Sequence, residues 1–406
     1  MEITGIIAEY NPFHNGHLYQ IQETKKLLSS DAIVAVMSGN FSQRGEAAIT
    51  HKFIRTKMAL NHGVDLVLEL PTVVATASAE HFAYGAIRLL HQTGIVTSLS
   101  FGSECGNLSQ LTPIAHALAD HKATINQFIQ HYLKQGISYP KARELSLIDF
   151  FGASNQAHNS LSIDTLKSPN NILGIEYLKA LYQLNAPINP VTIKRQGAHY
   201  HAPNIMGSIA SASAIRQNLY AASDAFKGAM PPSSTELLSG HPLPSMEKLS
   251  AFLHFKLMFS TLDELYALWD IPKDLLHTLV KASKDYPSYQ MLVERATSKT
   301  YTRATVQRSL LRILLALQKS DLSSRDAFIP YIRVLGCKKE SAYLLKLLSQ
   351  KASVPVITNL NKQYSKLDAY AKKWLDYEIA ASKLYSYVTD DASLATLDFT
   401  HPFILI

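Results

Sequence analysis

The chain opens with the stretch Ile6-Ile7-Ala8-Glu9-Tyr10-Asn11-Pro12-Phe13-His14-Asn15-Gly16-His17-Leu18, and this stretch decides its fold. The apolar run from Ile3 to Ala8 has the length and the β-branched content of a buried strand. Pro12 cannot donate to a strand ladder, so the chain must turn there. After Gly16 the apolar residues recur at helical spacing. The stretch therefore predicts a strand, a turn and a helix in direct succession.

Two histidines, His14 and His17, lie three residues apart at the start of the predicted helix. That spacing puts both imidazoles on one side of the first turn, beside backbone N–H groups that have no intrahelical acceptor. The positive end of the helix dipole suits an anion there, and phosphate above all. Two histidines can also be surface residues or mutual packing partners. Their position astride Gly16, at a strand-to-helix turn, favours the phosphate site.

Composition sets the outer limits on the class of protein. The chain has 406 residues, a formal net charge of +7 and two distant cysteines, Cys105 and Cys337. This length predicts two or three domains with ample core. The cysteines form neither a disulfide framework nor a zinc-binding pattern, which favours a reducing compartment. Because the sequence also lacks a secretory signal pattern and a membrane-length apolar run, we expect a cytoplasmic protein without a membrane partner.

Strands and helices alternate through the first half of the chain. Helical patterns separate the first strand from further β-rich apolar runs at residues 32–37, 65–70, 98–102 and 188–193. This alternation is typical of the α/β class and predicts a doubly wound parallel sheet. In such sheets ligands bind outside the carboxyl ends of the strands. The His14/His17 turn and Gly102 both fall at that edge.

A change of composition near residue 220 predicts two domains. Mainly helical patterns at about 108–161 form an insertion or helical layer within the first domain, residues 1–220. Proline-rich segments follow, and long helical patterns then dominate residues 221–406. We therefore expect an α/β domain followed by a mainly α-helical C-terminal domain.

Three further segments contain residue types suited to ligand binding. The loop 38–46 has two glycines and an arginine, although a solvated surface loop is an equally good interpretation. Ser168-Pro169-Asn170-Asn171 is a capping sequence, and the amide of Asn170 or Asn171 also offers a donor and an acceptor to a base or ribose. The segment 211–216 opens a helix and forms a second cradle for phosphate, while its Ser and Ala residues are also ordinary at a helix start.

Two pairs of lysines stand out in the second half of the chain. Such runs are most often a solvated face, but lysine clusters also supply the phosphate contacts of nucleic-acid surfaces. A nucleic-acid surface is the leading functional interpretation of Lys338, Lys339, Lys372 and Lys373.

The His-x-Gly-His motif after a first strand resembles the nucleotidyltransferase superfamily, whose Rossmann-like members transfer a nucleotidyl group from ATP. The chain as a whole resembles one of its families, the bacterial tRNA(Met) cytidine acetate ligases. The segments that carry this resemblance are residues 7–17, the loop 38–46, Ser168-Pro169-Asn170-Asn171, Lys194-Arg195-Gln196-Gly197-Ala198 and residues 211–216. The resemblance covers the N-terminal domain motif by motif and the remainder by length and helical character.

The resemblance implies a two-step reaction with ATP, acetate and elongator tRNA(Met). Acetate and ATP give acetyl-adenylate and pyrophosphate, and the acetyl group then passes to the exocyclic amine of the wobble cytidine. His14 and His17 would be the catalytic residues, the helical domain would bind tRNA, and Mg²⁺ would accompany the triphosphate without identified protein ligands. The implied ATP contacts are Ile7, Ala8, Glu9, Tyr10, Asn11, Pro12, Phe13, His14, Asn15, Gly16, His17, Leu18, Tyr19, Gln20, Gly102, Asn170 and Arg195.

Two other functions are compatible with the same residues. A small-molecule adenylyltransferase that joins ATP to a phosphorylated metabolite would use the same histidines, but it would leave the basic helical half unexplained. A non-catalytic RNA- or nucleotide-binding protein would use the ATP site only as a sensor. In that case His17→Ala would leave tRNA function intact, whereas a ligase would lose turnover.

Overall fold

The computed structural model describes residues 1–153, 163–196, 207–285, 287–321 and 329–406. Within these residues the strands form one mixed sheet in the order β5-β4-β1-β2-β3-β6-β7, with β8 paired to β6. The strands are β1 (Ile3–Ala8), β2 (Ala32–Ser38), β3 (Leu66–Leu70), β4 (Ser98–Ser103), β5 (Asn189–Lys194), β6 (Ile332–Cys337), β7 (Val356–Ile357) and β8 (Ile404–Leu405).

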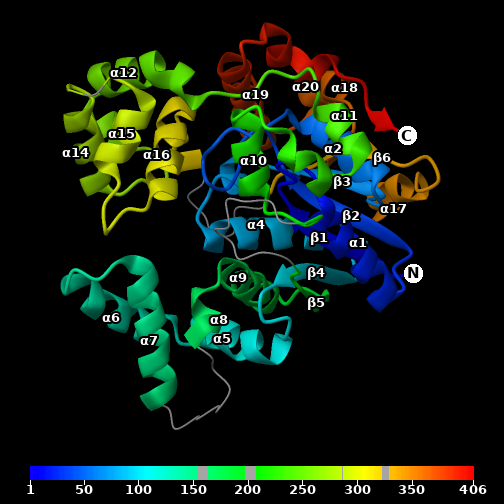
Figure 1. Ribbon diagram of the computed structural model, residues 1–406, viewed down its shortest axis with the longest axis horizontal. Helices are drawn as coiled ribbons and strands as arrows, with labels where there is room; N and C mark the ends of the chain where they lie inside the picture. The colour runs from blue at the N-terminus through cyan, green and yellow to red at the C-terminus, as the bar shows by residue number, and fades with distance from the viewer. Residues whose placement is uncertain (154–162, 197–206, 286, 322–328) are drawn as a thin grey trace.

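The five strands of the first half are parallel, and the chain starts in their middle at β1. Helices cover both faces (Figure 1). Alternate residues of β2 show this, because Val34 and Val36 belong to a core shared with α4, whereas Ile33 and Ala35 belong to one shared with α2. Because both faces of the sheet are buried under helices, β2 is a continuous hydrophobic run. The predicted doubly wound sheet is confirmed.

The helices of the first half alternate with these strands. They are α1 (Asn15–Leu28), α2 (Lys52–Asn61), α3 (Thr72–Ala75), α4 (Ala79–Gln92), α5 (Leu108–Asp120), α6 (Lys122–Lys134), α7 (Tyr139–Ala153), α8 (Ile163–Lys167), α9 (Pro169–Gln183) and α10 (Ala212–Tyr220). Helices α5 to α7 occupy the described part of the predicted helical layer at 108–161. Residues 154–161 of that prediction lie outside the described residues.

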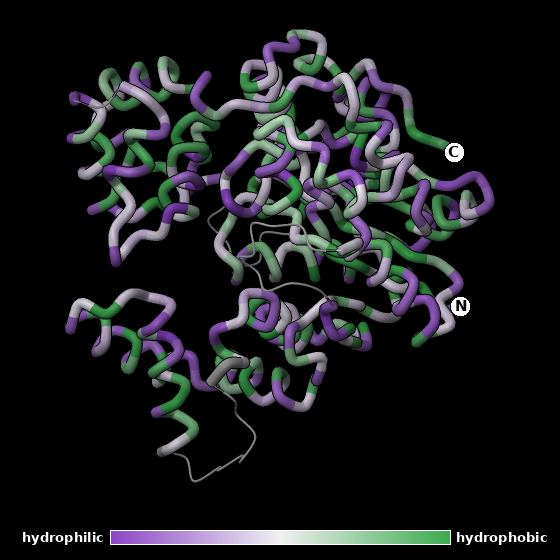
Figure 2. Tube along the Cα trace, in the orientation of Figure 1, coloured by the Kyte–Doolittle hydropathy of each residue, from purple (hydrophilic) through white to green (hydrophobic). Residues whose placement is uncertain are grey.

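The second half is mainly helical, as predicted. Its helices are α11 (Pro232–Leu238), α12 (Ser250–Phe259), α13 (Leu262–Tyr266), α14 (Lys273–Ala282), α15 (Tyr289–Ala296), α16 (Arg303–Leu315), α17 (Tyr343–Lys351), α18 (Leu360–Gln363), α19 (Ala369–Thr389) and α20 (Leu397–Thr400). Helices α12 to α16, which we call the helical module, pack around a hydrophobic core of their own with Leu275, Leu292 and Leu310 fully buried. Figure 2 shows hydrophobic and hydrophilic residues mixed along these helices, as expected for amphipathic helices.

Three strands of the second half join the sheet of the first, which the sequence analysis did not anticipate. Strand β6 pairs antiparallel with β3, and β7 and β8 both pair with β6. The sheet is therefore mixed and not purely parallel. Strand β6 was missed because Arg333 and Gly336 interrupt the apolar run by which a buried strand is recognised. The domain boundary at residue 220 stays a prediction, and the sheet continues across it.

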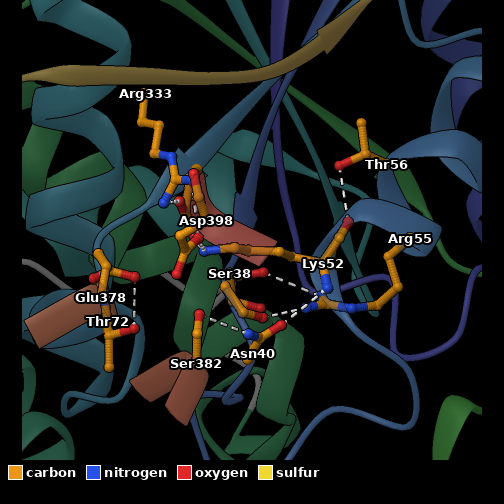
Figure 3. A network of polar contacts seen from close by, with 12 residues as sticks. Ser38, Asn40, Lys52, Arg55, Thr56, Thr72, Arg333, Glu378, Ser382 and Asp398 are labelled. Carbon is orange, nitrogen blue, oxygen red and sulfur yellow. Dashed lines mark hydrogen bonds and ion pairs between the residues drawn. The ribbon is translucent and has the colours of Figure 1, made fainter. Parts of the chain in front are cut away.

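A network of buried charges ties the C-terminal segment to the sheet (Figure 3). Lys52 Nζ lies 2.6 Å from both Glu69 Oε1 and Asp398 Oδ1. Arg333 contacts the same two carboxylates at 2.9 Å each. All four side chains belong to residues that are at most 5 % exposed. Two cations and two anions from α2, β3, β6 and α20 thus neutralise one another in a region that is buried from water.

Glu378 of α19 lies beside this network, under the loop that follows β2. Thr72 donates to both of its carboxyl oxygens, from the backbone N–H and from Oγ1. Burial raises the pKa of Glu378 to about 8, and the Glu69 carboxylate adds to the increase. A Cβ atom on Gly39 would lie 2.9 Å from Glu69 Oε1, so the loop after β2 can approach these acids only with glycine at this position.

Replacing Lys52 by methionine tests how much the network contributes to stability. The variant leaves Glu69 and Asp398 buried without one of their two cations, and we expect the free energy of unfolding to fall by about 3–5 kcal/mol. Urea denaturation measures the change. Lys57→Met, at a half-buried position on the same helix, is the control and should change stability by less than about 0.5 kcal/mol. Equal stability of the two variants would contradict this account.

Glu378 predicts a pH dependence of stability. Because its pKa in the folded state is above the usual 4.5, the folded protein keeps a proton that the unfolded chain has lost, and stability falls as the pH rises toward about 8. Glu378→Gln removes this contribution. We expect its melting temperature to fall less than that of the unmodified protein between about pH 6 and about pH 8.5, as measured by calorimetry. If the melting temperatures of the two proteins fall equally, the pKa of Glu378 is not raised.

Candidate active site

A cavity of about 340 Å³ lies at the carboxyl ends of β1, β4 and β5, the edge where doubly wound sheets bind ligands. A second cavity of about 290 Å³ adjoins it. We call them the first lobe and the second lobe. Their common wall consists of His17, Gln20, Gly102, Pro169, Asn170 and Arg195.

The two histidines of the opening motif form a reciprocal cap on helix α1. His14 Nδ1 accepts a hydrogen bond from Gly16 N at 3.0 Å, and His17 Nδ1 accepts one from His14 N at 3.2 Å. The rings stack with their centroids 3.7 Å apart. A Cβ atom on Gly16 would lie 2.9 Å from the His14 ring, so glycine is required for the ring to fold back. The motif is therefore a rigid local structure as well as part of the lining of the first lobe.

Both imidazoles are neutral at pH 7. Burial lowers the pKa of His14 to about 3, helped by the positive charges of Arg195 and Arg216. Burial also lowers the pKa of His17 well below its usual value, with His14 and Arg195 acting in the same direction. Because each Nδ1 accepts from a backbone N–H, each ring proton is on Nε2. Each histidine thus keeps one neutral N–H donor for a ligand.

The opposite wall of the first lobe is built by a reciprocal contact between the end of β4 and the start of α9. Glu104 accepts hydrogen bonds from Asn170 Nδ2 at 2.7 Å and from Asn171 N at 2.8 Å. In return, Asn171 Oδ1 accepts from the backbone N–H groups of Glu104 and Cys105. Of the two asparagines, Asn171 is structural, while Asn170 lines both lobes with its donor already bound to Glu104.

Arginines bring positive charge to the lobes: Arg195 lines both, Arg44 lines the second, and Arg216 acts on His14 from outside them. Arg195 follows β5, and a Cβ atom on Gly102 would lie 3.3 Å from its Cγ, so the glycine gives the arginine room. Arg216 of α10 donates to the carbonyl oxygen of Asn11 at 2.9 Å. This bond fixes α10 to the turn after β1. Ser211 caps α10 by accepting from Ala214 N.

Arg55 holds the ends of β1 and β2 together. This fully buried guanidinium donates to the carbonyl oxygens of Glu9, Ser38 and Gly39. Figure 3 shows Arg55 beside Ser38. The turn after β1 and the loop after β2 are thereby held in one geometry beside the lobes.

The lobes bring together most of the predicted ATP contacts. Those that line one lobe or both are Ile7, Ala8, Glu9, Tyr10, Asn11, His14, Gly16, His17, Tyr19, Gln20, Gly102, Asn170 and Arg195.

Four of the predicted contacts, Pro12, Phe13, Asn15 and Leu18, line neither lobe. Phe13 is fully buried and stacks on His62, with ring centroids 5.1 Å apart. Asn15 Nδ2 donates to the carbonyl oxygens of residues 208 and 228. Leu18 packs against the core on the α2 face of the sheet. These side chains support the turn, and their role as ATP contacts stays a prediction.

Sequence analysis missed Glu104, whose only signal is an acidic residue directly after a strand end. It also did not separate Asn170 from Asn171. Of the motif Lys194-Arg195-Gln196-Gly197-Ala198, the first three residues line the first lobe, and Gly197 and Ala198 lie outside the described residues.

None of the four predicted RNA-binding lysines lines either lobe. Lys338 and Lys339 follow the end of β6, and since β6 runs antiparallel to β3, they lie at the opposite edge of the sheet. Lys372 and Lys373 lie in the first turn of α19, where Lys373 Nζ is 3.6 Å from Asp321 Oδ2. Their role in RNA binding stays a prediction.

The described residues offer neither a cluster of metal ligands nor a helix suited to a bilayer. In that part of the chain, no group of three or more His, Cys, Asp or Glu side chains is placed to hold a metal ion. Nor does any helix there combine the length and apolarity needed to cross a bilayer.

The doubly wound sheet and the capped histidine turn at its carboxyl edge define a nucleotidyl transferase. The family model described as HIGH Nucleotidyl Transferase matches residues 1–398. A curated relative from Thermoanaerobacter sp. (strain X514), "tRNA(Met) cytidine acetate ligase", is 39% identical over 411 residues, which cover 100% of both chains. One of the same name from Caldicellulosiruptor bescii is 41% identical over 394 residues, covering 95% of this chain and 94% of the relative. The chain belongs to the tRNA(Met) cytidine acetate ligase family.

Solved structures agree with this family assignment. The crystal structure of Thermotoga maritima TmcAL in its apo form superposes with a TM-score of 0.93 and 31% identity, covering 100% of both chains. The structure of the same protein bound with alpha-thio ATP has a TM-score of 0.90 and 30% identity, again with 100% of both chains covered. The predicted family and its nucleotidyltransferase fold are confirmed.

The state of the two histidines can be measured by NMR of the ¹⁵N-labelled imidazoles. Since the pKa values of His14 and His17 are lowered, we expect neither ring to titrate between about pH 5 and about pH 8, and both to carry their proton on Nε2. A histidine-containing model peptide, which titrates near about pH 6.5, is the control. Titration of either motif histidine in that range would contradict the reciprocal cap.

Proposed function

We propose that the protein is an ATP-dependent ligase that activates acetate as acetyl-adenylate and then acetylates the wobble cytidine of elongator tRNA(Met). The observation that carries this proposal is the stacked His14/His17 pair, with two Nε2–H donors at a helix N-terminus in the first lobe. Full-length similarity to relatives named for this reaction supports the choice of substrates.

In this proposal ATP occupies the first lobe with its α-phosphate beside the two histidines. Attack by an acetate oxygen on the α-phosphorus builds negative charge on the nonbridging oxygens and on the departing pyrophosphate. Neutral N–H donors that are already oriented stabilise this charge without rearranging during the reaction. Arg195 adds charge-assisted hydrogen bonds to phosphate oxygens. The reaction needs no serine or cysteine nucleophile.

Asn170 and Gly102 would contact the adenosine. One N–H of the Asn170 amide is bound to Glu104, which orients its Oδ1 to accept from an adenine amine or a ribose hydroxyl. This contact depends on Glu104, which positions the side chain.

Mg²⁺ enters the proposal as part of the nucleotide substrate. The described residues contain no group of three acidic, histidine or cysteine ligands, so they do not fit a dedicated protein site for the ion. The triphosphate oxygens would hold it, and no step is assigned to it.

Residues 221–406 are the proposed tRNA-binding part, and residues 1–220 the proposed ATP-binding catalytic part. The cytoplasm is the proposed location, since ATP and tRNA are found there and both cysteines are free thiols.

The proposal is tested by incubating the protein with ATP and labelled acetate, with and without tRNA(Met). We expect acetate-dependent release of pyrophosphate and, with tRNA, label in acetylated cytidine by nucleoside mass spectrometry. His17→Ala removes one phosphate donor and should lower the first step about 10²–10³-fold with the fold retained. Pyrophosphate release that ignores acetate but requires another metabolite would contradict the proposal and favour a small-molecule adenylyltransferase.

A further inference from the structure

The second lobe has a chemical character of its own. One wall is apolar and aromatic, with Phe82, Phe101 and Tyr177, all less than 5 % exposed, beside the half-buried Leu173. The other wall comes from the end of β1 and the loop after β2 and includes Glu9. The lobe thus has flat apolar surfaces on one side and the Glu9 carboxylate on the other, together with the guanidinium groups of Arg44 and Arg195.

The Glu9 side chain is held in place through one of its two carboxylate oxygens. Its Oε1 accepts a hydrogen bond from Gln43 N at 2.7 Å. Its backbone carbonyl accepts from the buried Arg55. The other carboxylate oxygen, Oε2, makes no hydrogen bond to any residue that the structure describes. Because Glu9 lines the second lobe and not the first, this acceptor serves a ligand in the second lobe.

The loop that orients Glu9 is anchored on the helical module. Arg308 of α16 donates to the carbonyl oxygen of Gln43 at 3.4 Å, and Gln307 donates to Glu46 Oε1 at 3.1 Å. A Cβ atom on Gly45 would lie 2.6 Å from Arg308 N, so loop and helix are in close contact. The second lobe therefore has a wall that rests on the second half of the chain.

These features fit a neutral nucleobase better than acetate. A cavity of about 290 Å³ is far larger than acetate needs, and beside Arg44 and Arg195 the Glu9 carboxylate offers an acceptor that acetate cannot use. A cytosine ring has apolar faces for the aromatic wall, and its exocyclic amine is a donor of the kind that Glu and Asp accept. The common wall suits acetate better, because His17 and Arg195 supply hydrogen-bond donors for its carboxylate there.

We infer that the second lobe binds the cytosine that receives the acetyl group, with its exocyclic amine donating to Glu9 Oε2. This inference rests on the proposed function and assigns the acceptor pocket. It also moves Glu9 away from the ATP contacts that the family resemblance implies. In the transfer, the amine nitrogen bonds to the acetyl carbon and the carbon–oxygen bond to AMP breaks. The electron pair leaves on the AMP phosphate, and the amine proton passes to Glu9.

Glu9→Gln tests this assignment when the two half-reactions are measured separately. The first is acetate-dependent pyrophosphate exchange into ATP without tRNA, and the second is transfer from supplied acetyl-adenylate to unmodified tRNA(Met). The amide presents a donor to the cytosine amine and cannot take its proton. We expect transfer to fall about 10²-fold or more, while the first half-reaction stays within about 3-fold of the unmodified protein.

Ala79→Trp is a second variant that does not depend on the charge of Glu9. Ala79 is half-buried at the start of α4 and lines only the second lobe, so an indole there fills the proposed base pocket. We expect the same selective loss of transfer. Glu104→Gln is the matched control in the first lobe and should weaken the first half-reaction, since it loosens Asn170.

The outcomes separate this inference from the proposed function. A loss of the first half-reaction in Glu9→Gln, or normal transfer in both second-lobe variants, would overturn the cytosine pocket. If the unmodified protein forms no acetyl-adenylate at all, the proposed function itself fails.

Discussion

The candidate active site depends on the reciprocal hydrogen bonds between the rings of His14 and His17 and the first backbone N–H groups of α1. These bonds use both Nδ1 atoms, and they therefore fix the tautomer of each ring without any neighbouring carboxylate. Burial keeps the rings neutral, so they are hydrogen-bond donors of constant charge. An anion at this helix N-terminus meets oriented dipoles and not a titrating cation.

Contacts from both halves of the chain hold the rim around this turn. Arg55 binds the ends of β1 and β2 through their carbonyl oxygens, and the Lys52 network fastens β6 and α20 to α2 and β3. Arg216 fixes α10 against the same turn. Because these groups are buried or half-buried and have their partners within the protein, the carboxyl edge of the sheet is preorganised before a ligand arrives.

Much of the first half could be predicted from the sequence because its signals are local. The apolar runs at 32–37 and 188–193 lie within one residue of the observed strands, and the glycine of the histidine motif has a contact that explains it. Strand β6 could not be found in this way, since its pairing with β3 joins segments more than 250 residues apart. Neither the Glu104–Asn170 bond nor the division into two lobes has a local signal, because both depend on how separate loops meet.

The basic clusters show a different limit of sequence reasoning. The local composition predicts an RNA contact at Lys338 and Lys339. The antiparallel direction of β6, however, puts both residues at the edge of the sheet opposite to the lobes. Only the topology of the sheet gives that direction.

The most direct measurement of the central claim is a crystal structure of the protein with a nonhydrolysable ATP analogue. The account predicts the triphosphate in the first lobe, with α-phosphate oxygens within about 3 Å of Nε2 of His14 and His17. A nucleotide bound elsewhere, or histidine rings turned so that Nδ1 faces the phosphate, would contradict it.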